Sequence, residues 1–347
     1  MQQKNTSFAP EEQGLVDLFS RSISYLRVSI TDRCNLCCLY CVTEEESNGV
    51  LTKLRHIDLL SYEEILRVVS IAVSMGINKI RLTGGEPLLR RNVMEFIRNL
   101  GQIQGINDIR LTTNGVLLKD AAQDLYAAGV RKVNMSLDTL RPERFTKITG
   151  VNCFNRVWEG LLAVLAGTFS TIKLNMVVMR HVNDDEILDF VRLSQRMPIQ
   201  VRFIEFMPIG HSSRWQNNIY VSNDEIMFRI SRLGPLIPQQ QEHDGPARVF
   251  RLGGDTPGTL GFISPLSQHF CRSCNRLRLT SAGTLRSCLL CDQEIDLRTM
   301  LREETDDTLI RAAIVSAIQS KPEQHHLEQH ALRSSAACHG LMSRIGG

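Results

Sequence analysis

Strand-type and helix-type segments alternate along the first two thirds of the chain, and this alternation limits the folds open to it. Six short runs favour β-structure, at 26–30, 79–82, 108–112, 132–137, 171–178 and 201–206. Helical patterns lie between most of them, around 93–100, 121–128, 157–166 and 185–194. Strands joined by helices predict a parallel sheet with right-handed crossovers. We therefore expect an α/β fold, either an incomplete barrel or an open doubly wound sheet.

The best-marked helix follows the first strand. Ser61 and Glu64 are spaced as a capping box, apolar residues recur at helical intervals after them, and Gly76 ends the pattern. Beyond residue 210 the alternation breaks down, although a helical pattern returns near 306–319. We predict an N-terminal extension at 1–20, a partial barrel at 21–233 and a smaller C-terminal domain at 234–347.

Composition narrows the possible environments. The 347 residues carry 40 Lys and Arg against 37 Asp and Glu, a balance that gives no support to nucleic-acid binding. No apolar run has the length of a membrane span, so we expect a cytoplasmic protein without membrane attachment. In a reducing cytosol ten cysteines predict metal ligation more readily than disulfides, and eight of them fall in two groups.

The first group is Cys34-x3-Cys38-x2-Cys41. Three thiolates can hold three irons of a cubane cluster and leave the fourth iron open to a substrate or cofactor. Cys37 is an additional thiol within this loop. Because neighbouring residues on such a loop point apart, we expect Cys37 to face outward. The loop thus predicts chemistry in addition to electron storage.

Polar motifs follow the predicted strands at their carboxyl ends. They are Cys34, Thr83-Gly-Gly-Glu-Pro87, Thr112-Thr-Asn114, Ser136 with Asp138, and 205–207. In parallel α/β folds this rim holds ligands and catalytic groups. A protein that only stored a cluster would not need such a rim, so its presence favours an enzyme.

Two of these features have simpler interpretations. Gly84 and Gly85 could let a ligand approach the backbone, but a Gly-Gly-x-Pro sequence is also ordinary turn chemistry. Tyr40 could stack on an aromatic ligand, whereas a core position is the commoner fate of a tyrosine.

The second group is Cys271-x2-Cys274-x13-Cys288-x2-Cys291, and its spacing leaves a zinc ribbon and a second iron–sulfur cluster both open. Arg276 and Arg278 follow at alternate positions of a strand-type segment. Such residues share a face, so both guanidinium groups could bind one anion.

Taken together, these motifs resemble the radical S-adenosylmethionine superfamily. Within it the chain is similar to the GTP 3′,8-cyclase family of molybdenum cofactor biosynthesis. The matching segments are Leu26-Arg27-x-Ser29, Thr31-Asp-Arg-Cys34, Arg81-Leu-Thr-Gly-Gly-Glu-Pro87, Thr112-Thr-Asn-Gly115, Ser136-Leu-Asp138, Cys274-Asn-Arg-Leu-Arg278 and Gly346-Gly347.

The resemblance implies an incomplete (β/α)6 barrel closed by a C-terminal domain, with two 4Fe–4S clusters. It assigns Cys34, Cys38 and Cys41 to the first cluster, and Cys271, Cys274 and Cys288 to the second. The implied S-adenosylmethionine pocket comprises Tyr40, Gly84, Gly85, Glu86, Asn114, Ser136 and Met207. The implied GTP site comprises Arg27, Lys79, Arg81, Thr112, Lys173, Arg202, Arg276, Leu277 and Arg278. The implied catalytic set is Arg27, Arg276, Arg278, Gly346 and Gly347, with the terminal glycines entering the active site.

The implied reaction is reductive cleavage of S-adenosylmethionine to a 5′-deoxyadenosyl radical, which removes hydrogen from GTP C3′ so that this carbon attacks C8. The product would be (8S)-3′,8-cyclo-7,8-dihydroguanosine 5′-triphosphate. The family further implies an external low-potential electron donor, cyclic pyranopterin monophosphate synthase as the next enzyme, and a homodimer.

Several alternatives stay open. A radical S-adenosylmethionine enzyme acting on a peptide would share most of these motifs, and a non-enzymatic metal-binding module would share the cysteines. Cys291 could close the second site as a fourth ligand, which would leave no open iron for guanine. The tail histidines at 325, 326, 330 and 339 resemble a metal-binding tract, but we interpret them as part of a solvated helical segment.

Overall fold

The computed structural model describes residues 15–42, 53–209, 217–240, 245–303, 306–325, 338 and 340–346. Six parallel strands form the centre of its sheet: β1 (Tyr25–Ser29), β2 (Lys79–Thr83), β3 (Asp108–Thr113), β4 (Lys132–Ser136), β5 (Thr171–Val178) and β6 (Gln200–Glu205). The strand-type runs predicted from sequence are confirmed, each to within one residue at either end.

Later strands extend this sheet at both edges. They are β7 (Leu236–Pro238), β8 (Arg248–Leu252), β9 (Thr259–Ile263), β10 (Arg276–Leu279), β11 (Thr284–Arg286) and β12 (Glu294–Asp296). β9 pairs in parallel with β6, and β10 pairs in parallel with β1. The strand order is β12-β11-β10-β1-β2-β3-β4-β5-β6-β9-β8-β7, so the described strands form an open barrel wall. The strand that carries Arg276 and Arg278 thereby becomes a neighbour of the strand that precedes Cys34.

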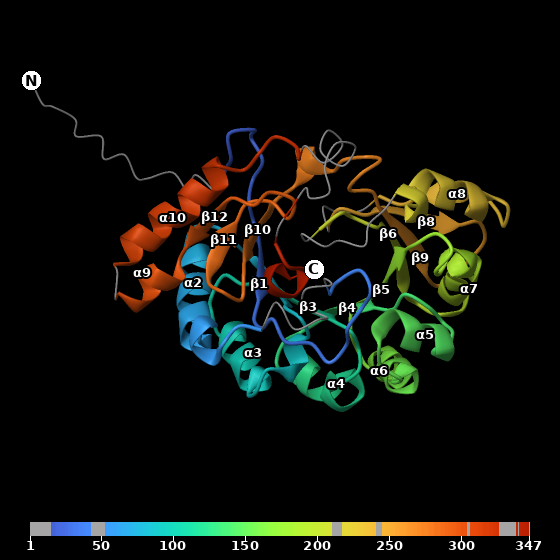
Figure 1. Cartoon of the computed structure of the whole chain (residues 1–347), viewed down its shortest axis with the longest axis horizontal. Coiled ribbons are helices and arrows are strands. Elements are labelled where there is room, and N and C mark those ends of the chain that lie inside the picture. The colour runs from blue at the N-terminus through green and yellow to red at the C-terminus, as the bar shows by residue number, and fades with distance from the viewer. Residues whose placement is uncertain are drawn as a thin grey trace, which may run out of the picture.

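Helices cover the outer side of the curved sheet (Figure 1). They are α2 (Tyr62–Ser74), α3 (Val93–Gly101), α4 (Leu118–Ala127), α5 (Pro142–Thr149), α6 (Phe154–Ala166), α7 (Ile187–Arg196), α8 (Asn223–Ser231), α9 (Arg298–Arg302) and α10 (Asp307–Gln319). The Ser61 and Glu64 capping box of α2 is present with both of its hydrogen bonds. A doubly wound sheet would have helices on both faces, so this arrangement confirms the incomplete barrel.

Side-chain alternation along the strands separates the core from the interior of the barrel. On β1, Leu26 and Val28 are fully buried in the apolar core, whereas Tyr25 and Arg27 line a central cavity. The same alternation recurs on the other barrel strands and directs polar side chains inward. The last short helix, α12 (Met342–Ile345), lies within the curve of the sheet (Figure 1).

No helix of the described part of the chain is long and apolar enough to cross a membrane. The division into domains at residue 233 stays a prediction, since strands from both sides of it share one sheet.

We predict that Gly160 is required where α6 crosses α4. A Cβ atom there would lie 2.5 Å from the Gly115 carbonyl oxygen and 3.1 Å from Leu118 Cβ. Gly160→Ala should lower the free energy of unfolding by about 1–3 kcal/mol, because backbone atoms cannot move aside cheaply. Chemical denaturation with circular dichroism would measure this change.

Gly101→Ala is the matched control for Gly160→Ala. Gly101 also lies in a helix, and the nearest atom to its added Cβ would be 3.5 Å away. Alanine there should be neutral or stabilise by up to about 1 kcal/mol through helix propensity. Equal effects of the two substitutions would show that the α4–α6 crossing does not require glycine.

Candidate active site

A single cavity in the barrel brings the two cysteine groups together. Its lining includes Cys34, Cys38, Cys41, Cys271, Cys274, Cys288, Arg27, Arg81, Arg202, Arg276, Arg278, Tyr40, Gly84, Gly85, Thr112, Asn114, Ser136, Asp138 and Met207. These residues come from the carboxyl ends of the barrel strands and from the C-terminal segment. The predicted convergence of strand-end motifs on one rim is therefore present in the fold.

The Gly84-Gly85 turn packs against the backbone of the first cysteine loop. The Gly85 N–H donates to the Thr31 carbonyl (2.7 Å), and the Glu86 N–H donates to the Arg33 carbonyl (2.8 Å). A Cβ at Gly84 would lie 2.6 Å from the Thr31 carbonyl oxygen. From sequence we expected that these glycines could let a ligand approach the backbone. In the structure the backbone of the cysteine loop makes such a close approach, so the two glycines fix the position of that loop.

Glu86 connects this turn to the loop that follows β3. Its carboxylate is fully buried and accepts hydrogen bonds from the Leu88 N–H, the Thr113 hydroxyl and the Asn114 N–H. Burial raises the Glu86 pKa to about 7, against the opposing effect of these donors. The Asn114 Nδ2 in turn lies 3.6 Å from Cys34 Sγ. Two strand-end motifs therefore brace the first cysteine loop.

Tyr40 connects the first cysteine loop to the segment that follows β4. Its hydroxyl donates to Asp138 Oδ2 (2.8 Å), and the Val177 N–H donates to Asp138 Oδ1 (2.8 Å). Burial raises the pKa of Asp138 to about 6. Burial also raises the pKa of the Cys38 thiol, and the nearby Asp138 and Cys41 add to this effect. A cationic metal core held by Cys34, Cys38 and Cys41 would relieve the repulsion among these groups.

Cys37 lies outside the cavity lining and is exposed. Its N–H donates to the Thr149 carbonyl (2.8 Å), which turns this residue toward the end of α5. The expectation that Cys37 faces outward is confirmed by this placement.

The second cysteine group is built around cations. Arg276 Nη2 lies 3.4 Å from Cys274 Sγ. Burial by itself would raise the Cys274 pKa, but the charges of Arg276 and Lys321 outweigh burial and hold it at about 6. Cys274 is consequently a thiolate at neutral pH, the form that binds metals.

Two further cations hold this group in place, and sequence reasoning missed both. The buried Lys321 Nζ donates to the carbonyls of Arg276 (2.9 Å) and Ser287 (2.5 Å), joining the strand after Cys274 to the loop before Cys288. Arg21 donates to the carbonyls of Cys271 (2.9 Å) and Pro322 (2.7 Å). Both residues lie far in sequence from at least one of the segments that they join, so no local pattern predicted these contacts.

Cys291 does not join the three cysteines that line the cavity. Its carbonyl accepts a hydrogen bond from Arg286 Nη2 (2.5 Å), and this guanidinium group also lies 3.4 Å from the buried Cys338 Sγ. The geometry therefore favours Cys271, Cys274 and Cys288 as the ligand set over a four-cysteine ribbon.

A row of arginines crosses the cavity between the two cysteine groups. Arg278, Arg27 and Arg81 occupy matching positions on β10, β1 and β2. Burial lowers the pKa of Arg278 to about 9, and the neighbouring Arg276 adds to the decrease. The Arg27 pKa is also lowered, by burial first and then by Arg278 and Arg81. This arrangement is suited to a ligand with several negative charges.

The C-terminal tail reaches this row. Arg278 Nη1 donates to the Gly346 carbonyl (2.6 Å). Gly346 has a positive φ of 78°, and a Cβ there would collide with the Thr83 hydroxyl. The structure thus brings Gly346 beside the arginines, while Gly347 lies outside the described residues.

Four residues of the predicted site are placed elsewhere. Lys79 lines a neighbouring pocket with Arg272 and Arg276, and the fully buried Leu277 belongs to the apolar core. Glu86 and the buried Lys173 do not contribute to the lining of the main cavity. Their roles in binding stay predictions.

Conversely, sequence reasoning missed other residues of the cavity lining, among them the polar residues Tyr25, Asn134 and Asn175. On their strands Tyr25 lies two positions from Arg27, Asn134 two positions from Ser136, and Asn175 two positions from Lys173. Residues two apart in a strand point to the same face, so this alternation could have identified them from sequence.

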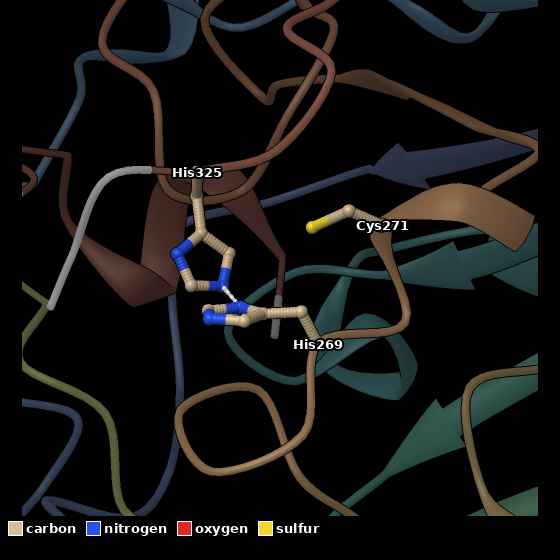
Figure 2. Close-up of side chains that lie close together, drawn as sticks. All are labelled: His269, Cys271 and His325. Atoms are coloured by element: carbon tan, nitrogen blue, oxygen red, sulfur yellow. Dashed lines mark hydrogen bonds between the residues drawn. The ribbon is translucent and has the colours of Figure 1, made fainter.

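His325 corrects the interpretation of the tail histidines as a solvated helix. It lies after the end of α10, is buried, and its ring faces His269 (Figure 2). His326, His330 and His339 lie outside the described residues.

The cavity has the donors that iron–sulfur clusters and a polar cofactor require. Each half presents three cysteines, and the buried Tyr25 Oη, Thr112 Oγ1, Asn134 Oδ1 and Asn175 Oδ1 have no hydrogen-bond partner among the described residues. Buried polar atoms are normally satisfied, so these four indicate where a ligand makes its hydrogen bonds.

Comparisons with known proteins agree with this geometry. Residues 28–194 match the radical SAM superfamily, and residues 199–327 match the Molybdenum Cofactor Synthesis C family. A GTP 3′,8-cyclase of Thermodesulfovibrio yellowstonii is 48% identical over 332 residues, covering 95% of this chain and 99% of the relative. The chain belongs to the GTP 3′,8-cyclase family. Another member, from Pelotomaculum thermopropionicum, is 49% identical over 313 residues, covering 90% of this chain and 95% of the relative.

Solved structures support the fold of this GTP 3′,8-cyclase family member. Streptococcus suis SuiB bound to S-adenosylmethionine superposes with a TM-score of 0.58 at 13% identity, covering 85% of this chain and 68% of SuiB. SuiB bound to its precursor peptide SuiA gives a TM-score of 0.60 at 13% identity, covering 92% of this chain and 75% of SuiB. As a GTP 3′,8-cyclase family member, the chain uses two 4Fe–4S clusters and S-adenosylmethionine.

We predict that the two cysteine groups differ in reactivity when no cluster is bound. Since the Cys274 pKa is about 6, roughly nine tenths of this thiol is ionised at pH 7, whereas the raised pKa of Cys38 keeps that residue protonated. Iodoacetamide labelling of Cys274 should rise steeply between about pH 5 and pH 7. Mass spectrometry of quenched samples would measure both rates.

Arg276→Met should move the labelling of Cys274 to higher pH, because it removes the charge that most strongly opposes the effect of burial. Arg272→Met, an exposed arginine of the same loop, is the matched control and should leave the profile unchanged. Labelling of Cys38 at least as fast as that of Cys274 at pH 7 would contradict this account.

Proposed function

We propose that this chain converts GTP into (8S)-3′,8-cyclo-7,8-dihydroguanosine 5′-triphosphate, the first step of molybdenum cofactor biosynthesis. The observation that carries the proposal is the arginine row Arg278, Arg27 and Arg81 between the two cysteine groups. A triphosphate supplies the several negative charges that such a row favours. The curated relatives named GTP 3′,8-cyclase, similar over nearly the whole chain, support this choice over a peptide substrate or a non-enzymatic module.

At the first site, Cys34, Cys38 and Cys41 would hold a cluster with one open iron. Gly84, Gly85, Tyr40, Asn114, Ser136 and Met207 would position S-adenosylmethionine, with Glu86 acting behind them by fixing Asn114. When bound, the cluster and S-adenosylmethionine supply the one-electron chemistry that produces a hydrogen-abstracting radical. The role of the protein is to exclude water and hold one C–H bond within reach.

At the second site, Cys271, Cys274 and Cys288 would hold the other cluster, whose open iron would bind the guanine base. Arg276 and Arg278 are two residues apart on β10 and so share a face, from which they would bind the triphosphate. Arg27, Arg81, Thr112 and Arg202 would complete the contacts from neighbouring strands, with Lys79, Lys173 and Leu277 next to them. Gly346 and Gly347 would close the pocket, because the Gly346 carbonyl already accepts a hydrogen bond from Arg278.

We further propose that the protein works in the cytoplasm as a homodimer. It would take electrons from an external low-potential donor and deliver its product to cyclic pyranopterin monophosphate synthase. These assignments are supported by family membership alone.

The direct test is an anaerobic assay with both clusters reconstituted. Protein, reductant, S-adenosylmethionine and GTP should give 5′-deoxyadenosine and the cyclised nucleotide, and GTP deuterated at C3′ should transfer deuterium to the 5′-deoxyadenosine. Chromatography with mass spectrometry would measure both products. Protein with two intact clusters that forms neither product would refute the proposal.

The arginine row also predicts how ligands stabilise the protein. GTP should raise the melting temperature of the reconstituted protein more than GMP does, and guanosine should have the smallest effect, because each phosphate offsets buried positive charge. The difference between GTP and guanosine should shrink at high salt. Differential scanning fluorimetry would measure the shifts.

Arg278→Met should reduce the GTP shift, whereas Arg98→Met, at an exposed position on α3, should not. Equal stabilisation by guanosine and GTP would mean that the row does not bind the triphosphate.

A further inference from the structure

Three side chains able to bind a metal meet at the rim of the second cysteine group. His269 precedes this group, Cys271 begins it, and His325 lies after the end of α10. Each offers one ligand atom, and these three atoms lie within 4.8 Å of one another. In Figure 2 the two imidazole rings meet edge to face, and the Cys271 sulfur points toward them.

The fold holds the three residues together by contacts of their own. His269 Nδ1 and His325 Nε2 are 2.7 Å apart, and His325 Nε2 also lies 2.7 Å from the Pro265 carbonyl oxygen. His325 is buried, so its position on one side of the site is fixed by the surrounding protein. A residue 56 positions away in sequence is thus kept beside His269.

This donor set suits zinc. Zn²⁺ binds histidine nitrogen at about 2.0–2.1 Å and cysteine sulfur at about 2.3 Å, which places tetrahedral ligand atoms about 3.3–3.8 Å apart. The nitrogen pair would therefore open by about 0.6 Å, and the sulfur would move closer by up to about 1 Å. Two imidazoles and one thiolate also select zinc over magnesium or calcium, which prefer oxygen ligands.

We propose that His269, Cys271 and His325 bind one Zn²⁺ ion when the second cluster is not in place. The histidines bind as neutral imidazoles. The Nε2 proton that His325 donates to the Pro265 carbonyl is lost to solvent and replaced by one at Nδ1, and the Cys271 thiol releases its proton to solvent on binding. The site does not need Cys274 or Cys288, and it differs in this from a zinc ribbon. Because Cys271 is also a proposed cluster ligand, zinc and the second cluster exclude one another.

The test uses the full-length, cluster-free chain with Cys34, Cys38 and Cys41 replaced by serine and its other thiols reduced, titrated with Zn²⁺ against a chromophoric zinc chelator. These substitutions remove the other three-cysteine group, which would also bind zinc. We expect one tight site. His269→Ala, His325→Ala and Cys271→Ser should each weaken it by at least about 100-fold, since each removes one of three ligands. Cys274→Ser, Cys288→Ser and the exposed-histidine control His56→Ala should bind zinc as the unmodified chain does.

Two results would overturn the proposal. One is a chain that binds no zinc in competition with the chelator. The other is zinc binding that survives both histidine substitutions and is lost in Cys274→Ser or Cys288→Ser, which would place the ion among the cysteines. Circular dichroism of each variant would show whether it folds.

Cobalt gives a readout that does not depend on a loss of affinity. Co²⁺ added to the same cluster-free chain carrying Cys274→Ser should give a thiolate-to-cobalt absorption band, and this band should be missing when Cys271→Ser is added to Cys274→Ser. A band that persists in Cys271→Ser would contradict the assigned sulfur.

Mutual exclusion can be measured by iron content. Protein loaded with zinc before reconstitution should take up about half of the iron that zinc-free protein takes up, since one of two clusters cannot form. The His269→Ala/His325→Ala double variant, treated with zinc in the same way, should recover full uptake. Full iron uptake by zinc-loaded unmodified protein would show that the two metals do not share Cys271. None of these measurements requires cyclase activity.

Discussion

The arrangement of the active site depends on positive charges buried side by side. Arg278, Arg27 and Arg81 stand in register on three adjacent strands, and neighbouring strands are about 4.8 Å apart. Burial lowers the pKa of both Arg27 and Arg278. Arg278 and Arg81 add to the decrease at Arg27, and Arg276 adds to it at Arg278. Such a row is suited to an anionic ligand.

The motifs around the row mainly hold the cysteines in place. The Gly84-Gly85 turn fits against the first cysteine loop, and Glu86 fixes the Asn114 loop behind it. At the other site, Lys321 joins the two segments that carry Cys274 and Cys288. These contacts are made by the protein itself, so each cavity wall can be formed before a cluster arrives. The same preformed wall brings His325 beside Cys271 and creates the proposed zinc site.

Sequence alone predicted the barrel strands and most of the cavity because their signals are local. Strand alternation, the capping box of α2 and the spacing of the cysteines all lie within short segments. Sequence did not predict that β9 and β10 extend the sheet at opposite edges, since their pairing joins residues far apart in the chain. Lys321, Arg21 and the burial of His325 were missed for the same reason. Sequence predicted that Cys37 faces outward, but the cysteine spacing left Cys291 undecided. Only the three-dimensional placement shows that Cys291 lies outside the cavity lining.

We infer that two three-cysteine clusters, each with an open iron, face one cavity across the arginine row. Anomalous diffraction at the iron edge, from anaerobic crystals of the reconstituted protein, would locate both. We expect two iron centres, one held by Cys34, Cys38 and Cys41 and the other by Cys271, Cys274 and Cys288. Cys37 and Cys291 should bind no iron. A fourth cysteine ligand at either centre, or an iron centre outside this cavity, would contradict the account.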